Sequence, residues 1–72
     1  MNYELFIDGQ EPIEFKFIDE AIVMGQRLGG GKFLIWYGDL FCCIGHPNFR
    51  VIYSEEYKSW YQNCQRAYYG NE

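Results

Sequence analysis

Residues 32–53, KFLIWYGDLFCCIGHPNFRVIY, place the strongest constraint on what this chain can fold into. Two turn signals, Gly38 with Asp39 and residues 45–48 (GHPN), divide the stretch into three short apolar runs. Glycine at the first position of a two-residue turn favours a type II′ hairpin. The stretch therefore predicts an antiparallel meander of three strands, around which the rest of the chain must pack.

The hairpin turn sets a register that pairs Trp36 with Phe41 and Ile35 with Cys42. The second turn pairs Cys42 with Val51 and Ile44 with Phe49. Since side chains alternate along a strand, these pairings predict two faces. The predicted core face carries Phe33, Ile35, Tyr37, Leu40, Cys42, Ile44, Phe49, Val51 and Tyr53. The predicted second face carries Lys32, Leu34, Trp36, Phe41, Cys43, Arg50 and Ile52.

The segments before the meander predict a hairpin and a helix. Residues 3–7 and 13–17 alternate on either side of a turn cluster at residues 8–12, which is typical of a hairpin with a longer loop. Its predicted inward side chains are Tyr3, Leu5, Ile7, Ile13, Phe15 and Phe17. Asp19 is the predicted N-cap of the helix, and the glycines at 29–31 end it. The predicted inward residues of this helix are Ala21, Met24, Gly25 and Leu28.

A second helix is predicted after the meander. Ser54 has the position of an N-cap, and Glu55 and Glu56 follow in the first turn, where the helix dipole favours acids. Apolar residues three and four apart predict one buried face, made of Tyr57, Trp60, Tyr61, Cys64, Ala67 and Tyr68. Gly70 is the predicted stop. We expect Trp60 to be buried against the meander, near Cys42 or Val51.

The predicted element order is ββαβββα over a single domain, residues 1–72. The fold class is α+β in two layers, with an antiparallel sheet of about five strands and both helices on one face. From Asp19 onward, the order of one helix, three strands and one helix resembles the double-stranded-RNA-binding domain. That family has a lysine cluster at the start of its last helix, whereas this chain has Glu55 and Glu56 there. The resemblance therefore implies a topology and no RNA-binding residue.

Composition restricts the classes of partner. The formal net charge is −4, with six Lys and Arg against ten Asp and Glu, which disfavours a phosphate backbone and permits a basic protein partner. Three cysteines, two of them adjacent, do not match a disulfide framework, and no signal peptide or membrane-length apolar run is visible. A reducing, cytoplasmic setting is expected.

Cys42, Cys43, Cys64 and His46 are the residues from which a metal or thiol site would be built. Adjacent cysteines in a regular strand point to opposite faces, which is a poor arrangement for zinc. A thiol enzyme would use Cys43 as nucleophile with His46 as base, and it would need a third group to hold the base. We instead expect reduced, structural cysteines, an exposed His46 in a turn, no metal, no cofactor and no catalytic residue.

The leading functional hypothesis is a non-enzymatic module that binds another protein. The predicted contact residues are Trp36, Phe41, Arg50, Leu34, Ile52, Asp39, Glu55 and Glu56. Surface acids, Glu4 and Glu14 among them, would steer a basic partner, and a homodimer through the same patch is possible. Phage-encoded antagonists of host defence, including anti-CRISPR proteins, are often single acidic domains of this size, so the hypothesis extends to an inhibitor that occludes a basic, nucleic-acid-binding surface. The alternatives are a single-stranded nucleic-acid binder that stacks bases on Trp36 and Phe41, and a thiol enzyme.

Overall fold

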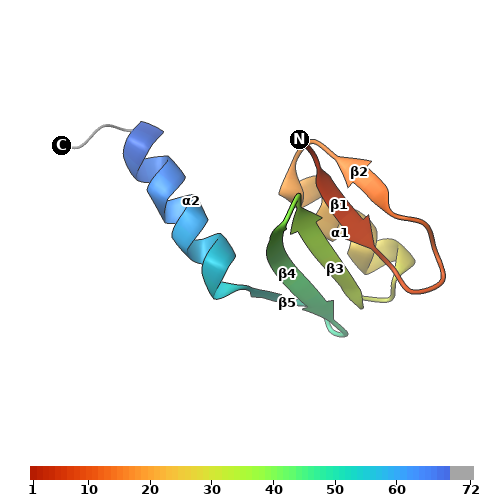
Figure 1. The fold of residues 1–72 in the computed structure, drawn as a ribbon. Coiled ribbons are helices and arrows are strands. Elements are labelled where there is room, and N and C mark those ends of the chain that lie inside the picture. Colours follow the sequence, from red (N-terminus) through yellow and green to blue (C-terminus); the bar gives the residue numbers. More distant parts are fainter. Residues whose placement is uncertain (69–72) are drawn as a thin grey trace.

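The structure, a computed structural model, describes residues 1–68 and contains one five-stranded antiparallel sheet and two helices (Figure 1). The strand order across the sheet is β2-β1-β3-β4-β5. The elements are β1 (Tyr3–Phe6), β2 (Ile13–Phe15), α1 (Ile18–Leu28), β3 (Phe33–Tyr37), β4 (Leu40–His46), β5 (Arg50–Tyr53) and α2 (Glu55–Tyr68). The predicted α+β class and the order ββαβββα are confirmed.

The N-terminal hairpin extends the sheet at the free edge of β3 and does not cover either face. β1 pairs antiparallel with both β2 and β3, so that Tyr3 lies opposite Tyr37 and Leu5 opposite Ile35. β3 is therefore the central strand, with two strands on each side.

The first turn of the meander has the predicted form, but the register beyond it differs from the prediction. Gly38 has a φ of 63°, and Trp36 pairs with Phe41 as expected. A bulge then shifts the register between Ile35 and Trp36, so that Ile35 lies opposite Cys43 instead of Cys42. The extra residue on β4 places both Cys42 and Cys43 on the core face, where each is 0% exposed.

Because of this shift, every later side chain of β4 lies on the opposite side of the sheet from the side predicted. The predicted pairs of Ile44 with Phe49 and of Cys42 with Val51 are wrong, because Ile44 pairs with Ile52 and Gly45 with Val51. Ile44 therefore faces away from the core and Cys43 faces into it, the reverse of the prediction. Phe49 lies in the turn with a φ of 61° and is 77% exposed, so its assignment to the core is also wrong.

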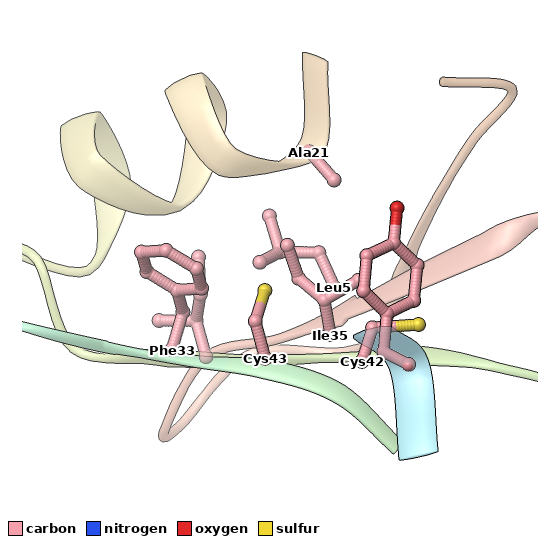
Figure 2. Packing of buried hydrophobic residues seen from close by; sticks show 8 residues of the cluster. Leu5, Ala21, Phe33, Ile35, Cys42 and Cys43 are labelled. Carbon is pink, nitrogen blue, oxygen red and sulfur yellow. The ribbon is translucent and has the colours of Figure 1, made fainter. Parts of the chain in front are cut away.

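The core lies between the sheet and the two helices, which are both on one face as predicted. Ala21 of α1 and Tyr57 of α2 belong to the same buried cluster, and Figure 2 shows Phe33, Ile35, Cys43 and Ala21 on facing sides of it. The buried apolar residues are Leu5, Ile7, Ala21, Phe33, Ile35, Cys42, Cys43 and Tyr57.

Helix α1 begins at Ile18, so the prediction that Asp19 is its N-cap is wrong. The cap position is Phe17, which has extended backbone and no side-chain cap bond, while Ile18 packs against the core. Asp19 lies in the first turn, where its charge still meets the favourable end of the helix dipole. Phe17 and Leu28, both predicted inward, are 62% and 48% exposed.

Helix α2 is attached to the sheet at its N-terminal end and projects from the body, which measures 44 × 25 × 17 Å with the helix included (Figure 1). Tyr57 is buried, whereas Tyr61 is 47% exposed and Cys64 is exposed. Trp60 is half-buried against Tyr37 and Tyr57, which corrects its predicted burial near Cys42 or Val51. Gly70 and the side chains of Ala67 and Tyr68 lie outside the described residues.

Within residues 1–68, neither helix has the length and apolar character required to cross a membrane.

The predicted cap of α2 is confirmed and gives the first testable prediction. The Ser54 hydroxyl accepts a hydrogen bond from the Tyr57 N–H at 2.9 Å and donates one to the Phe41 carbonyl. Ser54→Ala should therefore lower the free energy of unfolding by about 1–2 kcal/mol. Urea denaturation followed by circular dichroism measures this, and Ser59→Ala in the same helix is the control. An unchanged midpoint for Ser54→Ala would contradict the capping role.

Candidate protein-binding face

The sheet face opposite α1 carries a continuous row of apolar side chains, and we call it the open face. The register places Phe6 beside Leu34, Leu34 beside Ile44, and Ile44 beside Ile52, which spans four strands. One row further along the strands, Trp36 lies beside Phe41. Helix α1 packs on the other side of the sheet, and α2 joins the same core through Tyr57 and then projects away from the body, so within residues 1–68 neither of them covers this face (Figure 1).

An aromatic pair forms one end of the open face. The rings of Trp36 and Phe41 lie 5.2 Å apart at an angle of 52°, and both side chains are half-buried by their mutual packing. Leu34 and Ile52 beside them are 37% and 48% exposed. Four of the residues predicted to contact a partner are therefore brought together on one surface. Contiguous exposed apolar surface on a single chain marks an interaction site in many proteins.

Charged residues occupy two opposite corners of the open face. Glu4 on β1 lies directly opposite Glu14 on the edge strand β2, in the same row as Trp36. His46 on β4 lies directly opposite Arg50 on the other edge strand, β5. Like charges in cross-strand positions are destabilising, so the two carboxylates would gain from contact with groups of opposite charge.

The remaining predicted acids lie at the same end of the sheet as Trp36. Asp39 is in the turn that joins β3 to β4, one pair beyond Trp36 and Phe41. Glu55 and Glu56 open α2 directly after β5, where Ser54 is bonded to the Phe41 carbonyl. Glu55 also contacts Lys58 at 3.5 Å. With Glu4 and Glu14, this end of the molecule is acidic.

Three residues of the open face were not recognised from the sequence as contact residues, namely Phe6, Ile44 and His46. His46 is the last residue of β4 and half-buried, and the prediction that it is an exposed turn residue is wrong. The alternation of residues 3–7 already places Phe6 on the face away from the core. Ile44 and His46 had no such signal, because their facing depends on the bulge.

The paired cysteines are held in the core as thiols. Burial raises the pKa of Cys42 to about 11 and that of Cys43 to about 12, and the neighbouring Cys42 contributes to the shift of Cys43. A thiol with a raised pKa is a poor nucleophile at neutral pH. Cys64 is exposed on α2. Within the described residues, 1–68, no group of three His, Cys, Asp or Glu side chains is placed to hold a metal ion.

Comparisons with known proteins add no relative: no family model, no curated protein and no solved structure matches this chain. The functional argument therefore depends on the open face alone.

Proposed function

We propose that this protein is a non-enzymatic binding module that docks its open face on another protein. The observation that carries the proposal is the uncovered apolar row with the Trp36–Phe41 pair at one end. Tryptophan and arginine are the residue types most enriched in binding hot spots, and Trp36 and Arg50 belong to this face.

The proposed partner presents a basic surface. Glu4 and Glu14 lie on the open face beside Trp36, and Asp39, Glu55 and Glu56 surround the same end. Lysine and arginine side chains of a partner would relieve the repulsion between Glu4 and Glu14, while the apolar row supplies the contact area. A basic protein surface commonly binds nucleic acid, so the proposed effect is inhibition by occlusion, of the kind that phage anti-defence and anti-CRISPR proteins exert.

A nucleic acid is a weaker candidate for the same face. Bases could stack on Trp36 and Phe41, but Glu4 lies directly opposite Trp36 and repels the phosphates that would accompany them. The basic residues of the face, Lys32, His46 and Arg50, lie at the far end from the aromatic pair.

The test uses the tagged protein as bait in an extract of the organism that encodes it. We expect the wild type to retain a basic protein, and Trp36→Ala to weaken the purified complex by at least about 2 kcal/mol, roughly 30-fold in Kd. Tyr61→Ala is the control, because Tyr61 is an exposed aromatic on α2 away from the open face. The captured protein should also lose its binding to nucleic acid when this chain is added.

Two results would overturn the proposal. One is a complex whose Kd is the same for Trp36→Ala and Tyr61→Ala, because the open face would then not be the contact. The other is retention of a single-stranded oligonucleotide by the purified protein at low salt, abolished by Trp36→Ala, which would assign the face to nucleic acid. Circular dichroism of both variants checks that each is folded.

A further inference from the structure

We infer that, in the free protein, the open face binds the open face of a second copy of this chain in a two-fold dimer. This inference goes beyond the proposed function, since it needs no other partner. It rests on two corners of opposite sign, the acidic pair Glu4 and Glu14 and the corner where the cationic Arg50 lies opposite His46.

The acidic pair is unfavourable within one chain, and its charge is complementary to that of Arg50 at the other corner. Two carboxylates face each other across β1 and β2, and an imidazole faces a guanidinium across β4 and β5. Among the described residues, one ion pair joins Lys58 to Glu55, and Glu14 accepts a hydrogen bond from the uncharged side chain of Asn2 at 3.2 Å, so the charge of the acidic corner is not neutralised from within the chain. The open face thus presents negative charge at one corner and positive charge at the other, with apolar side chains between them.

The positions of the two corners define how the copies would be related. The acidic pair lies on the β2 side in the row of Trp36, and the basic pair lies on the β5 side, beyond the row of Leu34 and Ile44. The corners are diagonal to each other across β3. A two-fold axis between two facing sheets, running along the other diagonal, places each acidic corner over the basic corner of the second copy.

The same two-fold rotation places apolar residues of one copy against apolar residues of the other. Strands of the two sheets then cross at a large angle, as in orthogonal sheet packing. Trp36 of one copy faces Ile44 and Ile52 of the other, and the two Phe41 side chains meet near the axis. An isologous interface thus gains two copies of every contact, so the charge match occurs twice.

We expect the dimer to be weak enough for the proposed basic protein to displace one copy from the open face of the other. Stable interfaces bury about 800 Å² on each side, which requires most of a five-stranded sheet face and not the aromatic pair alone. We therefore expect a concentration-dependent equilibrium in the micromolar range, weakened by salt because charge pairs at the corners contribute to it.

Sedimentation velocity with charge-reversed variants tests this inference. Glu4→Arg with Glu14→Arg makes both corners positive, and His46→Glu with Arg50→Glu makes both corners negative. Each variant alone should be monomeric, with Kd raised on the order of 100-fold by repulsion at both corners. An equimolar mixture of the two should form a heterodimer at least as tight as the wild-type dimer, because every corner contact is then attractive.

The control variant is Glu11→Arg with Glu20→Arg, which changes the net charge as much as Glu4→Arg with Glu14→Arg does, at exposed positions off the open face. It should dimerise like the wild type. A wild type that remains monomeric up to 0.5 mM, or two variants that do not associate when mixed although circular dichroism shows both folded, would overturn the inference. Because no other protein is present, this result is independent of the partner-binding experiment.

Discussion

Replacing Phe33 with alanine should lower the free energy of unfolding by about 3–5 kcal/mol, which is most of the stability expected for a domain of this length. The Phe33 ring is 4% exposed and lies between α1 and the sheet (Figure 2). Its truncation would leave a cavity in a core of eight buried residues, and few neighbours are free to fill it. Urea denaturation gives the change directly.

The Phe33 ring fits in the core because two of its neighbours, Gly25 and Gly45, have no side chain. A Cβ atom at Gly45 would come within 2.2 Å of the Phe33 ring, and one at Gly25 within 2.6 Å. Gly45→Ala should therefore destabilise the parent by about 1–3 kcal/mol through overpacking. In a Phe33→Ala background the same substitution should cost almost nothing, since the clashing ring is gone. Equal costs in both backgrounds would show that Gly45 is required for another reason.

The order of elements could be predicted because it depends on local signals. The hairpin turn needs positive φ at Gly38, and the structure has it there. The α2 cap needs a hydroxyl at Ser54, three residues before a free N–H, and the bond to Tyr57 forms. Such features are settled by a few neighbouring residues, and the α+β class follows from their order.

The sequence could not predict which side chains of β4 point into the core, because this depends on packing across the sheet. Regular alternation would put either Cys42 or Cys43 outside, and a bulge instead buries both. Gly45 was the available clue, since glycine inside a strand often marks a close approach of another group. The bulge also moved Ile44 onto the open face and Cys43 off it.

The sequence predicted the apolar centre of the open face but not the two charged corners at its edges. Trp36, Phe41, Leu34 and Ile52 share one face as the alternation required. The two charged corners depend on long-range pairing of β1 with β3 and of β4 with β5, which no local signal specifies. The spacing in α2 predicted one buried face, and this is wrong for Tyr61 and Cys64, which are exposed because the helix projects beyond the sheet after Tyr57 and Trp60 (Figure 1).

Raising the pH from 7.5 to 10.5 should lower the free energy of unfolding by about 3–4 kcal/mol. Unfolded cysteines lose their protons near pH 9, whereas burial raises the pKa of Cys42 to about 11 and that of Cys43 to about 12. The folded state therefore binds more protons than the unfolded state above pH 9, and stability falls as pH rises. Below pH 9 both states are protonated and this contribution is fully present. Between the unfolded and the folded pKa of each thiol, the free energy of unfolding falls by about 1.4 kcal/mol per pH unit for that thiol.

Urea denaturation in the presence of a phosphine reductant, repeated at each pH, checks this behaviour. Burial also raises the pKa of Tyr3, Tyr53 and Tyr57, so the parent should lose further stability above pH 10 with the same sign. Cys42→Ala with Cys43→Ala should be less stable than the parent at pH 7.5 but lose much less between pH 8.5 and 10, because the two thiols with a raised pKa are gone. Cys64→Ala should follow the parent, since Cys64 is exposed on α2 and is not part of the core. If the double variant instead ran parallel to the parent across that window, the paired cysteines would not be the buried thiols that the bulge places in the core.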